Sequence, residues 1–273
     1  MKALETRALA IGYRRRRRSI VLARGLDLQL RRGSLVGILG ANGVGKSTLL
    51  RTLARMQAPL AGQVLLDGED TAHMLPLDVA RRLCIVLTAA PQDSLLTGYA
   101  LVALGRYPHS DWLGRLSKSD HAQVVWALQA VGAADLAERR VSELSDGQRQ
   151  KLMIARALTQ DCPLILLDEP TAFLDYPRRL ETLRLLRRLT RAADRAILVC
   201  THELDLALRY CDELWLMSES GMKIGAPAAI LRDGSLNEAF GIDGFGFAGD
   251  GGSLVPGGAE LSQSLESQEG GSL

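Results

Sequence analysis

A glycine-rich run at residues 40–48 has the residue types and spacing of a phosphate-binding loop. It reads Gly-Ala-Asn-Gly-Val-Gly-Lys-Ser-Thr, follows an apolar stretch of strand length and precedes a segment of helical period. In such a loop the glycines let backbone N–H groups surround phosphates, the lysine supplies a positive charge and the serine hydroxyl can bind Mg²⁺. The run therefore predicts a site for a nucleoside triphosphate and Mg²⁺. The residues expected to form it are Gly40, Asn42, Gly43, Gly45, Lys46, Ser47 and Thr48.

Two acids end a second apolar run. Residues 164–167 are Leu-Ile-Leu-Leu, and Asp168 and Glu169 follow directly. In a doubly wound sheet, ligands bind at the carboxyl ends of the strands. Beside the phosphate loop, Asp168 can hold Mg²⁺ through water, and Glu169 can orient or deprotonate the water that attacks the γ-phosphate. Taken alone, an acid pair after a strand is as often a helix cap, so the phosphate loop is what favours catalysis.

A polar segment at residues 144–148 introduces a helix. It reads Leu-Ser-Asp-Gly-Gln, which places Ser145 and the backbone of Gly147 at a helix N-terminus, where a second anion can bind. Alone, the segment indicates only a helix cap formed by Ser145 or Asp146. Its significance depends on its place in the chain, between the phosphate loop and the two acids.

Short apolar runs alternate with segments of helical period along the chain, which is typical of an α/β fold with a largely parallel sheet. Residues 97–158 contain helical segments without strands, and we expect a helical subdomain inserted in the α/β core. After about residue 244, Gly, Ser, Glu and Gln dominate, which predicts a tail with at most one weak strand. The expected strands are residues 34–39, 63–66, 83–87, 164–167, 196–200 and 213–217. The expected helices are residues 46–56, 120–131, 148–158, 178–190 and 204–210.

Composition and charge argue against several functions. A net charge of +2 gives little overall field for nucleic acid, and aromatic residues make up only 4% of the chain, too few for base-stacking platforms. No apolar run reaches the roughly 18–20 residues of a membrane helix, and the start lacks a secretion signal, so we expect a cytoplasmic location. The four cysteines lack C-x-x-C spacing and are expected in the core. The five arginines at residues 14–18 favour a solvated turn between two N-terminal strands over a nucleic-acid arm.

The order of these segments resembles the ATP-binding-cassette ATPase family over about residues 3–243. The phosphate loop is followed by residues 144–148, by Asp168 and Glu169, by Thr-Ala-Phe-Leu-Asp and, beyond a further strand, by His202. The resemblance implies an α/β P-loop NTPase core with antiparallel N-terminal strands and an inserted helical subdomain at about residues 97–158. Residues 1–243 would form the ATPase domain, and residues 244–273 a Gly/Ser-rich C-terminal tail.

The resemblance also implies that the nucleotide is ATP and that its site lies between two copies of the chain, facing head to tail as a homodimer. Lys46 and Ser47 would come from one copy, with Mg²⁺ held by Ser47 and Asp168. The residues expected from the other copy are Ser145, Gly147 and Gln148.

Further roles follow from the same resemblance. Tyr13 matches the aromatic residue that stacks on adenine, with an ordinary strand-face tyrosine as the alternative. His202 matches the histidine that hydrogen-bonds the γ-phosphate and holds Glu169 in position. Asp175 matches the acid that links the two sites across the dimer. Lys46, Glu169 and His202 are therefore the expected catalytic residues.

Two positions depart from the family pattern. Asp146 replaces a glycine, and because a carboxylate would repel the γ-phosphate, we expect its side chain to face away. The family also places a glutamine, which contacts Mg²⁺ and senses the membrane partner, after the strand at residues 83–87. Ungapped counting puts Thr88 at that position, whereas a short shift puts Gln92 there. Gln92 is the favoured ligand of the nucleotide and Mg²⁺.

Residues 103–109, Ala-Leu-Gly-Arg-Tyr-Pro-His, resemble the importer branch that serves iron-siderophore, haem and cobalamin uptake. This branch implies transmembrane permease subunits as partners, an extracytoplasmic substrate-binding protein as an indirect partner, and a peripheral location at the cytoplasmic face of the cell membrane. The alternative is a soluble ATPase of the same family that acts on nucleic acid or ribosomes. A single cassette, a short helical insert and the lack of a sustained heptad disfavour it, so no nucleic acid is expected. A scaffold without turnover would require loss of Glu169 or His202, and both are present.

Overall fold

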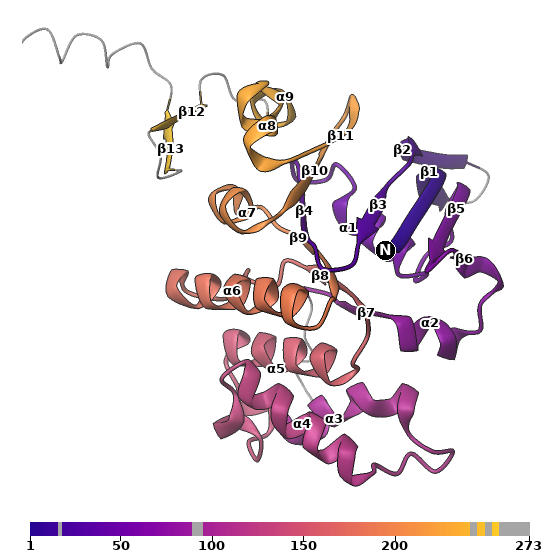
Figure 1. Cartoon of the computed structure of the whole chain (residues 1–273), viewed down its shortest axis with the longest axis vertical. Helices are drawn as coiled ribbons and strands as arrows, with labels where there is room; N and C mark the ends of the chain where they lie inside the picture. The colour runs from indigo at the N-terminus through magenta and orange to yellow at the C-terminus, as the bar shows by residue number, and fades with distance from the viewer. Residues whose placement is uncertain (16–17, 89–94, 241–244, 249–252, 257–273) are drawn as a thin grey trace, which may run out of the picture.

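The computed structural model describes residues 1–15, 18–88, 95–240, 245–248 and 253–256. A six-stranded sheet forms its centre, an antiparallel sheet lies beside it, and a group of helices forms the lower part of the molecule in Figure 1. Within the described residues, no helix is both long enough and apolar enough to cross a bilayer.

The six-stranded sheet carries the phosphate loop and the acids. Its strand order is β11-β10-β4-β9-β8-β7, and all neighbours are parallel except β10 and β11. Every residue of β4, β8 and β9 is buried, as is usual for parallel strands that are covered on both faces. The strands are β4 (Leu35–Leu39), β7 (Leu83–Val86), β8 (Leu164–Asp168), β9 (Ala196–Cys200), β10 (Glu213–Ser218) and β11 (Gly221–Gly225). The predicted parallel core is confirmed.

Alternate residues of the central strands face two separate cores, because successive side chains of a strand point to opposite faces. In β4, Leu35 and Leu39 belong to the core that the helical subdomain shares. Val36 and Ile38 belong to the core on the other face, with α1 (Lys46–Leu53) and the antiparallel sheet. The sheet is therefore held from both sides.

The antiparallel sheet forms around β1, which pairs with β2, β3 and β5. Its strands are β1 (Lys2–Arg15), β2 (Arg18–Leu26), β3 (Gln29–Arg31), β5 (Ala61–Leu66) and β6 (Glu69–Asp70). The predicted strand at residues 63–66 therefore belongs to this sheet and not to the parallel one. β1 and β2 extend into the arginine run, with Arg15 opposite Arg18, so the connection is shorter than the sequence suggests. Residues 16–17 lie outside the described residues.

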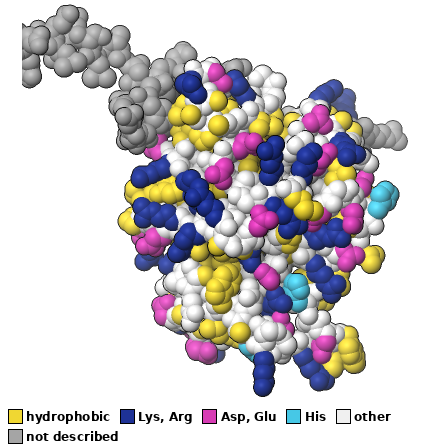
Figure 2. All heavy atoms as spheres, viewed as in Figure 1, with side chains coloured by type: hydrophobic (Ala, Val, Ile, Leu, Met, Phe, Trp, Pro, Cys, Tyr) yellow, Lys and Arg dark blue, Asp and Glu magenta, His cyan; other side chains and the backbone are white. Residues whose placement is uncertain are grey.

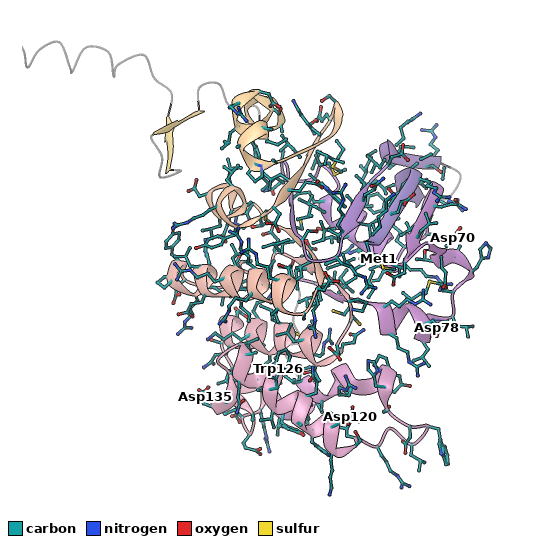
Figure 3. The ribbon with its side chains drawn as sticks, viewed as in Figure 1. Met1, Asp70, Asp78, Asp120, Trp126 and Asp135 are labelled. Carbon is teal, nitrogen blue, oxygen red and sulfur yellow. The ribbon has the colours of Figure 1, made fainter. Side chains whose placement is uncertain are left out.

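All of residues 97–158 are described, and they form the predicted helical subdomain. It contains α3 (Gly98–Ala103), α4 (Lys118–Ala130) and α5 (Asp146–Thr159). The 3₁₀ turns η2 (Leu104–His109), η3 (Ala134–Leu136) and η4 (Val141–Glu143) connect them. In Figure 3, Asp120 and Trp126 mark this subdomain, whereas Met1 and Asp70 mark the antiparallel sheet.

Two boundaries differ from the sequence-based expectation. α1 ends at Leu53 and not near residue 56, because Arg55 adopts a left-handed φ of 58° and the amide of Met56 donates to the carbonyl of Arg51 at 2.9 Å. The C-terminal stretch contains two paired strands, β12 (Phe245–Ala248) and β13 (Ser253–Pro256), where composition predicts at most one. Short runs with Phe, Leu and Val favour strands even inside a Gly-rich segment.

The other helices pack on the middle strands of the six-stranded sheet as well as on its edges. They are α2 (Pro76–Arg82), α6 (Tyr176–Ala192), α7 (Leu204–Tyr210), α8 (Pro227–Arg232) and α9 (Ser235–Phe240), with the 3₁₀ turn η1 (Thr71–His73). α6 confirms the helix predicted at residues 178–190, and it runs alongside α7 (Figure 1). All four cysteines are buried, as expected from their spacing.

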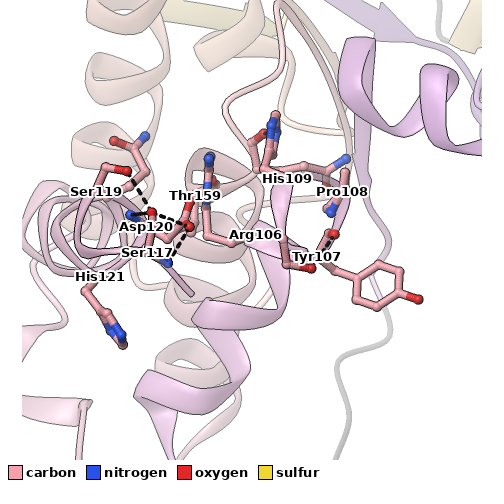
Figure 4. A network of polar contacts seen from close by, with 12 residues as sticks. Arg106, Tyr107, Pro108, His109, Ser117, Ser119, Asp120, His121 and Thr159 are labelled. Atoms are coloured by element: carbon pink, nitrogen blue, oxygen red, sulfur yellow. Dashed lines mark hydrogen bonds and ion pairs between the residues drawn. The ribbon is translucent and has the colours of Figure 1, made fainter. Parts of the chain in front are cut away.

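A buried ion pair joins the parts of the helical subdomain (Figure 4). Arg106 donates through Nε to Asp120 Oδ1 at 2.7 Å and through Nη1 to the carbonyl of Thr159 at 2.9 Å. The amide and hydroxyl of Ser117 donate to Asp120 Oδ2 at 2.8 Å and 2.6 Å. These bonds from Ser117, together with the Arg106 guanidinium, lower the pKa of Asp120 to about 2. The Arg106–Asp120 pair thus ties η2, α4 and the end of α5 together.

Replacing Asp120 with Asn should lower the free energy of unfolding by roughly 1–2 kcal/mol at neutral pH, because the amide cannot pair with Arg106 as an anion. The folded pKa lies below the unfolded value of about 3.9, so the stabilisation is complete above that value and is lost as pH falls toward 2. The difference between the urea midpoints of wild type and variant should therefore shrink below about pH 4. The control is Asp135→Asn, a change at an exposed acid. A difference between urea midpoints that does not change with pH would contradict a stabilising role for the Asp120 charge.

Candidate functional site

The phosphate loop joins the end of β4 to the start of α1. Gly40 has a φ of 150°, and a Cβ there would lie 2.2 Å from the carbonyl oxygen of Met217, so only glycine fits. Gly45, with a φ of 115°, is the N-cap residue of α1, and no side chain caps that helix end. Lys46 is 8% exposed, and its ammonium donates to the carbonyls of Gly40 at 2.7 Å and Ala41 at 3.0 Å. The lysine is therefore held against the loop at a helix N-terminus, the arrangement that phosphate binding requires.

The first turn of α1 contacts two other parts of the predicted site. Ser47 Oγ donates to Asp168 Oδ1 at 3.2 Å, which links the loop to the end of β8. The hydroxyl of Thr48 shares a hydrogen bond with the hydroxyl of Tyr13 in β1. Tyr13 is 44% exposed, so part of the residue remains accessible to solvent. The structure thus places Tyr13 where an aromatic ring can meet a base, and the stacking itself stays a prediction.

Glu169 and His202 form a pair at the same edge of the sheet. His202 Nδ1 lies 2.8 Å from Glu169 Oε2. Burial raises the pKa of Glu169, while the neighbouring His202 and, to a smaller extent, Lys46 act in the opposite direction. The backbone of Glu169 is left-handed, with a φ of 51°, and its amide donates to the carbonyl of Cys200 at 2.9 Å. A left-handed non-glycine residue costs about 1–2 kcal/mol, and such strain collects at functional sites.

The start of α5 carries the second predicted anion site. Ser145 and Gln148 form a reciprocal capping box, in which each side chain bonds the other's amide. A Cβ on Gly147 would lie 3.1 Å from the carbonyl of Phe173, so α5 begins against the 171–175 loop. Asp146 Oδ1 pairs with Arg149 Nη2 at 2.5 Å. Arg149 therefore pairs with the negative charge of Asp146, which stands where the family has a glycine, within the same helix.

The 171–175 loop, defined as the residues between Pro170 and α6, ends at Asp175. Asp175 Oδ1 accepts from the amide of Arg178 at 3.0 Å, so this carboxylate caps α6. Its side chain is 59% exposed, as a residue that contacts another chain must be before assembly. Phe173 in the same loop is 50% exposed.

Of the two candidates for the glutamine position, Thr88 and Gln92, only Thr88 belongs to the residues that the structure describes. Thr88 Oγ1 donates to the carbonyl of Asp168 at 3.2 Å, next to the Ser47 contact. Gln92 lies outside the described residues, and its role as a Mg²⁺ and nucleotide ligand stays a prediction.

The structure brings Tyr13, Lys46, Ser47, Thr48, Asp168, Glu169 and His202 together at one edge of the sheet. Ser145 and Gly147 lie on α5, which packs on α3 and α4, whereas α1 packs on β1, β8 and β9. The two halves of the predicted composite site thus belong to different layers of the chain (Figure 1).

Sequence reasoning missed Glu203 and Arg179. Glu203 directly follows His202, and its carboxylate pairs with Arg179 Nη1 at 3.1 Å. The only sequence signal is an acid next to the histidine, and a surface acid at a helix start has the same pattern.

Comparison with known proteins agrees with this geometry. Residues 23–172 match the family described as ABC transporter. The chain is 41% identical over 244 residues to the achromobactin transport ATP-binding protein CbrD of Dickeya dadantii, covering 89% of each chain. It is 37% identical over 244 residues to the iron(3+)-hydroxamate import ATP-binding protein FhuC of Bacillus subtilis, again covering 89% of each.

A solved structure extends the likeness to almost the whole chain. It shows a metal-chelate type ABC transporter in an inward-facing conformation, with a TM-score of 0.78 and 26% identity over 97% of this chain and 100% of that one. The family match spans more than half of the residues and includes the phosphate loop, Ser145 and Asp168. The chain belongs to the ABC transporter family.

Proposed function

We propose that the strand-edge cluster of Lys46, Ser47, Asp168, Glu169 and His202 hydrolyses ATP, and that hydrolysis energises uptake of an iron-siderophore, or of haem or cobalamin, through a separate permease. The chain is the ATP-hydrolysing subunit of an ABC importer. The observation that carries the chemistry is the 2.8 Å pair of His202 and Glu169 beside the Ser47–Asp168 contact. The names of the relatives, achromobactin transport and iron(3+)-hydroxamate import, support the siderophore class.

The phosphate loop binds the triphosphate. Backbone N–H groups at the start of α1 lack a side-chain cap and can bond phosphate oxygens. Lys46, held at the loop, places its charge beside the β- and γ-phosphates. Ser47 Oγ and Asp168 Oδ1 are oxygen donors of the kind that Mg²⁺ prefers, and Mg²⁺ commonly takes one or two protein ligands together with phosphates. When bound there, Mg²⁺ would neutralise phosphate charge.

Glu169 acts on the attacking water. Its carboxylate is partly buried, which raises its pKa and makes it a better proton acceptor than an exposed acid. His202 holds that carboxylate through Nδ1, so the acceptor oxygen has a fixed direction. The left-handed φ of 51° at Glu169 ends the extended backbone of β8 at this residue.

A second copy of the chain completes the site. Ser145 and the backbone of Gly147 form a helix N-terminus suited to the γ-phosphate, and they belong to a different layer from Lys46. A head-to-tail pair would place this helix end of one copy over the phosphate loop of the other. The exposed Asp175 and Phe173 would then lie at the contact between copies.

A groove of about 600 Å³ gives the permease a docking site at the cytoplasmic face of the membrane. It runs between α2, β7, η2 and the end of α5. Its walls are tied together, because Arg81 Nε donates to the carbonyl of Pro108 at 2.9 Å and Gln160 Nε2 to that of Ala80 at 2.6 Å. Leu104 and Tyr107 are 52% and 74% exposed at its rim, which suits an apolar segment of a partner.

Replacing Glu169 with Gln should reduce kcat for ATP hydrolysis by about 10²–10⁴-fold and leave ATP affinity unchanged, because the amide keeps the shape but cannot accept the proton. The variant should also form an ATP-dependent dimer that persists, since opening follows hydrolysis. Phosphate release and gel filtration with and without ATP measure both effects, with Glu181→Gln on the exposed face of α6 as the control. Turnover near the wild-type rate would remove Glu169 from this role.

Replacing Lys46 with Ala should weaken ATP binding by roughly tenfold or more, because a charged hydrogen bond to phosphate contributes about 1.5–3 kcal/mol. Equilibrium titration with a fluorescent ATP analogue measures the loss. Arg51→Ala, an exposed cation on the same helix, should bind as wild type does. Equal affinities for all three proteins would show that the loop does not bind phosphate.

The alternative function, action on nucleic acid or ribosomes, depends on the arginine run. Arg14, Arg15 and Arg18 continue the β1–β2 ladder, and on the face drawn in Figure 2 basic and acidic side chains are mixed. Filter binding of duplex DNA and RNA across a salt series should therefore detect no submicromolar affinity near physiological salt. Tight binding that a variant with Ser at residues 14–18 loses, with a salt slope flattened by about 0.9 per lost contact, would favour the nucleic-acid function.

A further inference from the structure

The carboxylate of Glu203 is buried next to His202 and does not cap the helix that it begins. Glu203 is the N-cap residue of α7, yet its side chain accepts no capping hydrogen bond there. The side chain is 9% exposed; Oε1 accepts a hydrogen bond from Thr171 Oγ1 and forms an ion pair with Arg179 Nη1, each at 3.1 Å. A buried carboxylate is costly unless it is paired. Its partners here come from two other segments of the chain.

Arg179 and Thr171 connect Glu203 to both ends of the 171–175 loop. Thr171 is 2% exposed and begins the loop. Arg179 Nε donates to the carbonyl of Leu174 at 2.7 Å, near the end of the loop, while Nη1 of the same guanidinium binds Glu203. The loop therefore cannot shift relative to Glu203 without breaking a charged contact.

Glu203 also directly follows His202 in the chain. The His202 side chain is 56% exposed, and Glu169 is its only side-chain polar partner within the part of the chain that the structure describes. More than half of the side chain is therefore uncovered, so its position depends on the contact with Glu169 and on the backbone that carries the ring. The amide of Glu203 donates to Thr201 Oγ1 at 3.1 Å, which holds that backbone at the end of β9.

We propose that Glu203 is a positioning residue that fixes His202 relative to the 171–175 loop through Arg179 and Thr171. The contact of His202 with Glu169 and the position of Asp175 are then set together. Because Asp175 and Phe173 are exposed where a second copy would bind, movement of the loop on assembly is transmitted to His202. This inference rests on the proposed roles of Glu169, His202 and Asp175.

The test begins with Glu203→Gln, which keeps the size of the side chain and an oxygen that can accept from Thr171 but removes the charge that pairs with Arg179. We expect kcat for ATP hydrolysis to fall roughly tenfold or more, since small misplacements of catalytic groups have effects of that size. KM and the equilibrium affinity for ATP should change less than about twofold, because the phosphate loop is untouched. Glu181→Gln, an exposed acid of α6, is the matched control, and urea midpoints measured on all variants separate this effect from unfolding. Wild-type kcat in Glu203→Gln would overturn the proposal, whether or not the variant's urea midpoint is lower.

Double variants show whether the effect passes through the named partners. In a His202→Ala background, Glu203→Gln should cause no further loss of kcat, and in an Arg179→Gln background the double variant should be no worse than the poorer single one. Arg179→Lys, which keeps the charge but not the two-sided fork, should lie between wild type and Arg179→Gln. Full additive losses in both backgrounds would overturn the proposal. An unchanged kcat in His202→Ala alone would instead refute the proposed role of His202, so the two failures are distinguishable.

Discussion

The site depends on the burial of β4, β8 and β9 on both faces, which holds the three strands in register. Cys200 at the end of β9 pairs with Ile38 on one side and Asp168 on the other, so the strands end level with one another. The phosphate loop follows β4, Glu169 follows β8, and His202 follows β9. Groups far apart in sequence therefore meet at one edge because the strands that carry them cannot slide: a one-residue slip would exchange the two cores.

Glu169, the proposed proton acceptor, shows how the fold changes the environment of an acid. Partial burial disfavours its charged form, while His202 and Lys46 favour it, so the local charges oppose the effect of desolvation. Its left-handed backbone is strained, and the hydrogen bond from its amide to Cys200 helps to hold that conformation. Opposed effects of this kind are typical of groups that exchange protons during a reaction.

α5 connects the two surfaces that we propose for the permease and for a second copy of the chain. Its N-terminus, at Gly147, packs on the 171–175 loop, and the residue after its last turn, Gln160, is bonded to the walls of the groove between α2 and η2. A helix is stiff along its axis, so a displacement at the groove would move the helix end that faces a second copy in the proposed head-to-tail pair. Glu203 extends the same connection to His202 through the loop. In the proposed assembly, a permease in the groove and the hydrolytic centre would thus influence each other through packed elements.

The sequence by itself determined the parts of this protein that depend on local pattern: the phosphate loop, the acids after β8, the alternation of strands and helices, and the helical insert. Each is set by spacing or periodicity within a short stretch of chain. Only the tertiary structure decided where α1 ends, that residues 61–66 join the antiparallel sheet, and that two strands pair after residue 244. It also decided that Glu203 binds Thr171 and Arg179, because such contacts join segments that become neighbours only after the chain has folded.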